Sequence, residues 1–230
     1  MDKTAIQNLA IVLIGAKTII SDTDAAKAGL LAKTLWDISY RGMLELPHNW
    51  KFATTRACIT GNLTTTPTSG QYSYQYKLPV LCLRVIAQID QYDDDTEYDH
   101  KIENFLSAEA VPKTYPVILT NETTCYIKYI HDLNQDYEIR RWPSWFARIV
   151  ALDLALLMCE PLKQDKQKVN QLQQMMYAPV IGWMSQAISA NGLSDSDTTS
   201  EHRDSDRGNN EVLNAGSELP HGKKYIISRE

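Results

Sequence analysis

The stretch SDTDAAKAGLLAKTLWDISYRGMLELPHNWKFATTRACI, residues 21–59, decides how the chain folds. Its apolar residues recur at helical spacing and stop before Pro47, which predicts one amphipathic helix over residues 22–45. Ser21 is a good N-cap, and Asp24 three residues later gives a variant of the capping box. The stretch carries almost no chemistry, so we interpret it as a packing element.

The two ends of this stretch are expected to pack against different parts of the molecule. Leu31, Leu35 and Ile38 are predicted to face a helical core. After a tight turn, Trp50 and Phe52 are predicted to enter a strand and to fix the junction between a helical part and a β part. A buried tryptophan contributes much of the packing energy of such a junction. We therefore expect the Trp50 ring to be buried.

Three further helices are predicted. Apolar residues recur at helical spacing over 4–17. Residues 144–162 are apolar on nearly every side, which is typical of a helix buried at the centre of a protein. A last helix over 163–189 is expected to begin near Pro161 and to be kinked or split at Pro179, because a proline ring clashes with the preceding turn.

The middle of the chain has the period of β-strands. β-branched and aromatic residues alternate there, and clusters of Gly, Pro, Asn, Asp and Thr separate the runs. The predicted strands are 52–60, 72–78, 78–89, 116–120 and 125–130, with a weaker pattern over 101–108. The segment NETT at 121–124 is expected to close a hairpin between its two flanking strands.

This order of elements predicts an α+β fold. The N- and C-terminal helices are expected to form a four-helix bundle, with an antiparallel β lobe inserted between them and an extended C-terminal tail. The expected domains are the bundle, residues 1–50 and 143–192, the β lobe, residues 51–142, and the tail, residues 193–230. The tail is rich in Ser, Asp, Asn and Gly, a composition typical of disorder.

Length and charge limit the possible functions. A chain of 230 residues suits one large domain or two small ones. A net charge of −5, without a dense cluster of Lys and Arg, argues against tight binding to DNA phosphates. The same charge is compatible with DNA that passes along the surface without being bound. The apolar run from Leu9 to Gly15 is too short to span a bilayer and lacks a basic leader. We expect a core helix in a protein made in the cytoplasm.

Catalytic motifs are missing from the sequence. It contains no phosphate-binding glycine loop, no G-x-S-x-G and no H-E-x-x-H, and its 5 histidines are scattered. None of the 4 cysteines forms a C-x-x-C pair, which favours buried, reduced thiols over a zinc site. We predict no catalytic, cofactor-binding or metal-binding residues and expect a protein that is not an enzyme.

Three groups of residues nevertheless allow a binding role. The acidic run at 93–99 could bind calcium but lacks the regular spacing of a calcium loop, so a solvated turn is favoured. The tryptophans could line a ligand pocket, but Trp36 and Trp145 lie on or beside apolar faces, which favours core packing. The pair Arg140 and Arg141 could contact phosphate, although the rim of an interface is the favoured setting.

The ordered series of motifs resembles a known family. It runs from NLAIVLIGAKTIIS through D-x-x-x-A-x-x-L-x-x-x-L-W-D-x-x-x-R to LPHNWKFATTRA, and continues with YSYQYKLPVLCLRV, CYIKYI and WPSWFARIVALDLALLM. Over about residues 5–190 this series is similar to the head-to-tail adaptors of short-tailed bacteriophages, the tail tubular protein A family. Trp50-Lys51-Phe52-Ala53 after a long helix is its most specific part.

The resemblance implies a structural virion protein rather than an enzyme. Such adaptors form a ring, commonly a dodecamer, that joins the portal vertex of the head to the tail nozzle, and genomic DNA passes through the lumen. The resemblance implies the portal protein and the tail nozzle protein as partners, with a tail fibre or tailspike in some phages, and no membrane. The protein would be assembled in the cytoplasm of the host bacterium and reside in the virion tail, below the portal. The alternative is another head-completion or tail nozzle component.

The polar tail and the aromatic residues are the expected interaction and junction sites. A disordered tail can wrap a partner through a few apolar anchors, and a C-terminal extension of such adaptors often runs along the portal. The expected anchors to portal or neighbour are Leu213, Leu219, Tyr225, Ile226 and Ile227. The segment 225–228 could add a strand to the sheet edge of a neighbour. The expected structural junction consists of Trp36, Trp50, Phe52 and Trp145.

Overall fold

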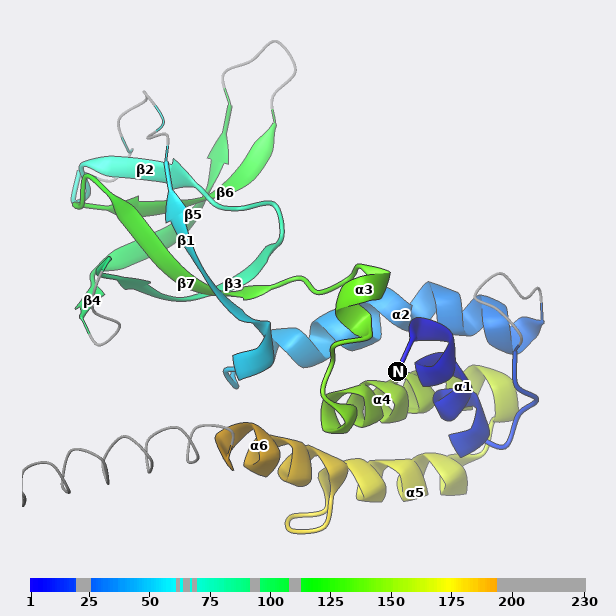
Figure 1. Ribbon diagram of the computed structural model, residues 1–230. Helices are drawn as coiled ribbons and strands as arrows, with labels where there is room; N and C mark the ends of the chain where they lie inside the picture. Colours follow the sequence, from blue (N-terminus) through cyan, green and yellow to red (C-terminus); the bar gives the residue numbers. More distant parts are fainter. Residues whose placement is uncertain are drawn as a thin grey trace, which may run out of the picture. The chain divides into compact units, whose positions relative to one another are not determined.

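A computed structural model describes residues 1–19, 26–60, 63, 67, 70–91, 96–107 and 113–193 (Figure 1). The chain divides into two compact units, Met1–Ala187 and Ile188–Glu230. The first unit is α+β and contains both antiparallel sheets. The predicted tail begins at the end of the last described helix, and its anchors lie outside the described residues, as do Ser21, Asp24 and the acidic residues 93–95.

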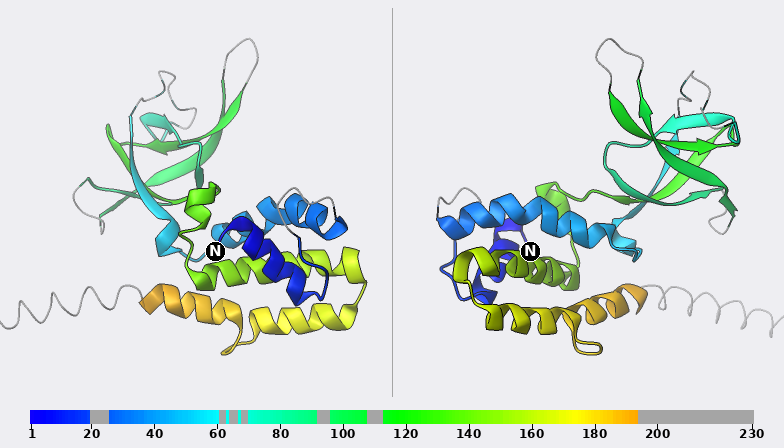
Figure 2. Two further views of the ribbon diagram at one scale, coloured as in Figure 1. Left: turned by 45° about the vertical axis from the view of Figure 1, so that its right-hand side comes forward. Right: turned by 180° about the vertical axis from the view of Figure 1, so that it is seen from behind.

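One central helix organises the helical part. The helices are α1 (Lys3–Leu13), α2 (Lys27–Glu45), α3 (Asp136–Ile139), α4 (Ser144–Lys163), α5 (Lys166–Tyr177) and α6 (Trp183–Leu193). As expected for its all-round apolar sequence, α4 is buried, and α1, α2 and α5 each pack against it (Figures 1 and 2). No helix of the described residues is both long and apolar enough to cross a membrane.

The prediction of a four-helix bundle is wrong. Because α4 is apolar around its circumference, it accepts α1, α2 and α5 on different sides, while α1 and α2 contact each other only sparsely. The predicted last helix is also two helices. The first ends at Tyr177 and the second begins at Trp183, so the split expected at Pro179 is confirmed.

The boundary between α4 and α5 also differs from the prediction. Pro161 lies in the last turn of α4 and does not begin a new helix. Gln164 ends α4 in the left-handed conformation, with φ of 53°. Asp165 then caps α5, because its Oδ1 accepts a hydrogen bond of 3.1 Å from the Lys168 backbone N–H. A side-chain cap therefore sets the start of α5.

The buried face of α2 is rotated from the predicted one. Ile38 was expected in the core but is 62 % exposed, and Leu31 and Leu35 are only partly buried. The apolar residues that are buried are Ala28, Ala32, Trp36, Tyr40, Met43 and Leu44. The two aromatic rings determine this orientation, because burying them removes more apolar surface from water than burying Ile38 would.

In the described part of the chain, seven strands form two antiparallel sheets. A short 3-10 helix, η1 (Lys51–Ala53), leads into β1, so Phe52 precedes the strand instead of lying in it. The first sheet has the order β1-β7-β3-β4 and the second β2-β6-β5. The bounds are β1 (Thr54–Ile59), β2 (Tyr74–Lys77), β3 (Cys82–Ile89), β4 (Glu97–Tyr98), β5 (His100–Leu106), β6 (Thr114–Thr120) and β7 (Cys125–His131).

The predicted hairpin at 121–124 is wrong. The strands that flank it, β6 and β7, belong to different sheets. β6 pairs with β2 and β5, whereas β7 pairs with β1 and β3. The last four residues of β6 are buried, and four of the seven residues of β7 are buried. Each therefore occupies the centre of its own sheet, and the connection crosses from one sheet to the other.

The two sheets share an apolar interior. Tyr76 and Ile118 of the second sheet pack with Ile127 and Tyr129 of the first. Gln88 of β3 is opposite Ile127 in the register and is fully buried. Neither the amide nitrogen nor the amide oxygen of its side chain has a hydrogen-bond partner. An unpaired buried amide opposes folding, because it gives up its hydrogen bonds to water.

Replacing Gln88 with methionine should stabilise the protein. Methionine has a similar shape and no polar group to desolvate, so the free energy of unfolding should rise by about 1 kcal/mol in urea titration. The matched control is Gln75→Met, since Gln75 is also buried but has no atom that is both buried and unpaired. Equal effects of the two substitutions would contradict this explanation.

Candidate functional site

The candidate site is the junction between α2 and the first sheet. The C-terminal end of α2 is held by Arg84 of β3. One guanidinium nitrogen, Nη2, donates to the backbone oxygens of Leu46 at 3.3 Å and His48 at 3.2 Å, and to Asn49 Oδ1 at 3.0 Å. A cation at the last carbonyls of a helix also interacts favourably with the helix dipole. The turn after α2 is therefore fixed to the sheet.

Trp50 is the central residue of the junction. Its side chain is fully buried, as expected, and its Nε1–H donates a hydrogen bond of 2.7 Å to the Met43 backbone oxygen. The indole packs against Trp145 and Phe146, with ring centroids 5.6 and 5.4 Å away. The apolar body of the indole is thus packed while its single polar group is paired. This residue joins α2, η1 and the start of α4.

The imidazole of His48 covers one side of Trp50. The two ring centroids are 4.6 Å apart, in an edge-to-face arrangement. Burial lowers the pKa of His48, and the nearby charges of Arg84 and Lys51 lower it further. The lowered pKa favours the neutral imidazole, which suits its packing against the Trp50 ring.

A continuous cluster of rings extends from Trp50. Trp36 stacks on Trp142 with centroids 6.0 Å apart and an interplanar angle of 3°, and Tyr40 lies 5.9 Å from Trp142. Phe52 packs on Phe146 at 4.7 Å. We call these seven side chains the aromatic cluster: Trp36, Tyr40, Trp50, Phe52, Trp142, Trp145 and Phe146.

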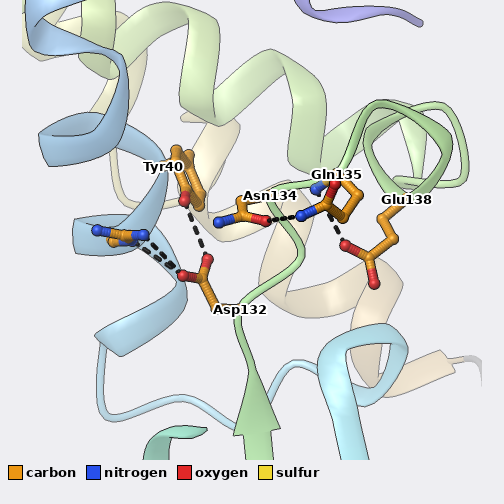
Figure 3. Close-up of polar contacts among 6 residues, drawn as sticks. Tyr40, Asp132, Asn134, Gln135 and Glu138 are labelled. Atoms are coloured by element: carbon orange, nitrogen blue, oxygen red, sulfur yellow. Dashed lines mark hydrogen bonds and ion pairs between the residues drawn. The ribbon is translucent and has the colours of Figure 1, made fainter. Parts of the chain in front are cut away.

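Asp132 attaches the end of β7, the second strand of the junction, to α2 (Figure 3). It follows the end of β7 and is only 4 % exposed. Its Oδ1 accepts a hydrogen bond of 2.9 Å from the Tyr40 hydroxyl, and its Oδ2 lies 2.8 Å from Arg41 Nη2. Burial and the Asp132 carboxylate raise the pKa of Tyr40 well above its usual range, so the hydroxyl stays protonated as a donor.

The segment after Asp132 is ordered by its own side chains. Gln135 Nε2 donates to Asn134 Oδ1 at 3.0 Å, and the Gln135 backbone N–H donates to Glu138 Oε2 at 3.0 Å (Figure 3). The other oxygen of Glu138 lies 3.4 Å from His131 Nε2. These contacts begin the short helix α3 and position Trp142 after it. The junction is therefore held by α2, β3, β7, α3 and α4 together.

A second carboxylate lies where α2 meets α4. Burial raises the pKa of Asp153 above its ordinary value, and the Ser39 hydroxyl lowers it only in part. The folded protein binds this proton more readily than the unfolded chain. The ionised group therefore opposes folding above its folded pKa, and that cost disappears as the pH falls through the folded pKa to the unfolded value of 3.8.

Replacing Asp153 with asparagine should increase stability in a pH-dependent manner. The variant should unfold at a higher urea concentration than the wild type at pH 7, because the desolvated charge is gone. The difference should shrink as the pH falls through the folded pKa toward the unfolded value of 3.8, because the wild-type carboxylate takes up its proton over that range. A difference that stays constant from pH 7 to pH 4 would show that the charge is not responsible.

The structure brings the four predicted junction residues together. Trp36, Trp50, Phe52 and Trp145 all belong to the aromatic cluster. The sequence pattern does not predict the polar half of the junction, which consists of Tyr40, Arg41, Arg84, Asp132 and Glu138. A carboxylate directly after the apolar strand CYIKYIH is the one local signal for Asp132. Its partners lie about 90 residues away, since the separations are 92 for Tyr40 and 91 for Arg41.

The four cysteines differ in how deeply they are buried. Cys125 and Cys159 are buried as predicted and Cys82 is half-buried, but Cys58 is exposed, so the expectation of burial is wrong for that thiol. Burial raises the pKa of Cys82 to about 11 and that of Cys125 to about 12. Within the described ranges, no three His, Cys, Asp or Glu side chains gather into a group that could hold a metal ion.

No protein-family model and no curated protein sequence matches this chain.

Proposed function

We propose that the chain is a structural virion protein, a head-to-tail adaptor whose ring joins the portal vertex to the tail nozzle and lets genomic DNA pass through its lumen. In this proposal it is not an enzyme and needs no cofactor. Its partners are the portal protein, the nozzle protein and other copies of itself, with a fibre or tailspike as a further partner. It works in the virion tail after assembly in the bacterial cytoplasm.

One observation carries the proposal. The motifs that resemble the adaptor family are separated along the chain, yet their residues meet at the junction. LPHNWKFATTRA supplies Trp50 and Phe52, YSYQYKLPVLCLRV supplies Arg84, and WPSWFARIVALDLALLM supplies Trp142 and Phe146. The motifs that carry the resemblance therefore supply the residues that hold the helical part and the β part together. A fixed angle between two parts is what a protein between two different rings requires.

Sedimentation with the portal protein of the same virus tests the proposal. The full chain should cosediment with assembled portal rings and saturate at a fixed ratio of chains to portal subunits. A nozzle component, the alternative assignment, should leave the portal unbound and should bind only after another tail protein is present. Failure to bind portal under all conditions would remove the adaptor assignment.

The C-terminal residues should matter for docking and not for folding. Deleting residues 193–230 removes the predicted anchors but none of the aromatic cluster, so the midpoint of urea unfolding should stay within the error of the wild type. Binding to portal rings should weaken, because apolar anchors concentrate the affinity of an extended segment. Unchanged portal binding by the truncated protein would contradict this assignment of the tail.

A further inference from the structure

The outer edge of β5 carries backbone groups that no strand of the described chain pairs. β5 is the last strand of the second sheet, with β6 on its inner side. The Ser107 backbone N–H donates to the Lys113 oxygen at 2.9 Å, in continuation of the β5–β6 register. Because hydrogen-bonded and non-hydrogen-bonded pairs alternate in an antiparallel ladder, Ile102, Asn104 and Leu106 form the non-hydrogen-bonded pairs. Their backbone N–H and C=O groups therefore point to the free edge.

The backbone of β6 supports this alternation. Asn104 is opposite Pro116 in the register, and proline has no N–H to donate. The Pro116 oxygen accepts a hydrogen bond of 3.1 Å from the Leu78 backbone N–H, which follows β2 on the other side of β6. Pro116 thus directs its acceptor away from β5, as a non-hydrogen-bonded pair requires.

The residues with these outward backbone groups also expose apolar side chains. Ile102 is 45 % exposed and Leu106 is 63 % exposed, and both lie on one face of β5. Ile102 is opposite Ile118, which is fully buried in the apolar interior that the two sheets share. That interior is therefore open at the edge of β5. A further strand beside β5 would pair the backbone groups and cover both side chains.

The other edges of the two sheets suit a further strand less well. The Leu63 backbone N–H donates to the Gln75 oxygen at 2.9 Å, so the outer edge of β2 is partly covered. β4 has only two residues, and β1 carries the exposed Arg56 and no exposed large apolar side chain. On β5, Lys101 lies 2.7 Å from Glu103. This pairing removes the net charge that protects many natural edge strands.

We propose that the further strand is β5 of a second copy, paired antiparallel about a two-fold axis at Asn104. β5 is complementary to itself in this register. Ile102 of each copy faces Leu106 of the other, and the two Asn104 residues exchange backbone hydrogen bonds. Lys101 faces Ser107 of the other copy, so no like charges are opposed. The second copy thus pairs the free edge and covers both exposed apolar side chains.

Charge and apolar cover together select this register. A two-fold axis perpendicular to the sheet passes through a residue of β5, because paired residues lie on the same face. An axis at Lys101 or at Glu103 would place two like charges directly opposite each other, which opposes pairing. An axis at Ile102 would put Leu106 beyond the end of the other β5 strand. The axis at Asn104 covers Ile102 and Leu106 together.

The contact belongs to the free protein and does not rest on the adaptor proposal. It is two-fold, whereas neighbours in a closed ring of more than two members meet through two different surfaces. Two strands of this length bury far less than the roughly 1,200–2,000 Å² of a typical stable interface. The dimer is therefore weak, and it must be trapped to be measured.

Disulfide trapping in the full-length protein tests the pairing. The exposed Cys58 is changed to serine in every preparation. Asn104→Cys places two thiols opposite each other at the two-fold axis, where paired Cα atoms are about 5.5 Å apart, within the range of a disulfide. Asn104 is exposed, so the variant should fold. Under mild oxidation we expect a covalent dimer at several times the yield of the control. Adding Leu106→Lys should reduce that yield, because a charge then faces Ile102.

The matched control is Lys101→Cys. It is an exposed position on the same strand, but in the proposed register it lies far from Lys101 of the other copy, so it reports random collisions. A yield from Asn104→Cys no higher than this control would overturn the inference, and so would a dimer that Ile102→Cys forms in preference to Asn104→Cys. Portal binding without the trapped dimer would disprove only the pairing. A trapped dimer without any binding to portal would support the pairing and count against the adaptor function.

Discussion

Replacing Trp50 with alanine should lower the free energy of unfolding by about 3–5 kcal/mol. The side chain is fully buried, and its loss would leave a cavity between Trp145, Phe146 and the end of α2. It would also leave the Met43 backbone oxygen without the donor that Nε1 supplies. Urea unfolding monitored by circular dichroism measures the loss.

Trp50→Phe is the control for this prediction. Phenylalanine keeps most of the ring packing but cannot donate to Met43, so it should cost clearly less than alanine. In the adaptor proposal, Trp50→Ala should also reduce binding to portal rings at temperatures where the variant is still folded, because the angle between the two parts is no longer fixed. A loss of stability below about 1 kcal/mol would mean that the junction does not depend on this ring.

Replacing Asp132 with alanine should have the second-largest effect, a loss of about 3 kcal/mol. The carboxylate accepts from the Tyr40 hydroxyl and pairs with the Arg41 guanidinium. Its removal leaves a buried hydroxyl without an acceptor, and a half-exposed cation that recovers part of its hydration from solvent. The expected loss therefore lies at the lower end of the range for a broken buried ion pair. Chemical denaturation measures it.

We call the contacts of Asp132 with Tyr40 and Arg41 the polar clamp, and two further variants separate its effect from a general effect of removing a charge. Asp136→Ala removes an exposed carboxylate four residues away and should change stability by less than about 1 kcal/mol. Tyr40→Phe should cost about 1–2 kcal/mol in the wild type and clearly less in the Asp132→Ala background, because the two groups share one hydrogen bond. Equal costs in both backgrounds would show that the two side chains do not interact.

The sequence pattern was sufficient for the elements that are determined locally. The all-round apolar run at 144–162 predicted the buried α4, and Pro179 predicted the break before α6. The turn at Pro47 and the burial of Trp50 also follow from local residue types. In each case the determining residue lies within the element or directly beside it, so no knowledge of the tertiary structure was needed.

The features that depend on distant partners were not predictable from local pattern. The spacing of the flanking strands predicts a hairpin at 121–124, yet β6 pairs with β2 and β5, and β7 pairs with β1 and β3. The buried face of α2 was set by Trp36 and Tyr40 against Trp142, a residue more than 100 positions away. The four-helix bundle does not form because α4 is apolar over most of its surface and packs separately with α1, α2 and α5.

The polar clamp illustrates the same limit for the candidate site. The sequence pattern assigns no role to either Arg41 or Asp132. Their ion pair depends on β7 ending beside the C-terminal part of α2, which is a property of the complete fold. The aromatic residues were easier to assign, because a large apolar side chain must be buried wherever its element lies.

Negative-stain electron microscopy of the purified protein mixed with portal protein tests the adaptor assignment most directly. We predict a ring of additional density on one face of the portal, coaxial with its channel and absent from images of portal alone. Particles of the protein that stay monomeric and leave the portal unchanged would contradict the account.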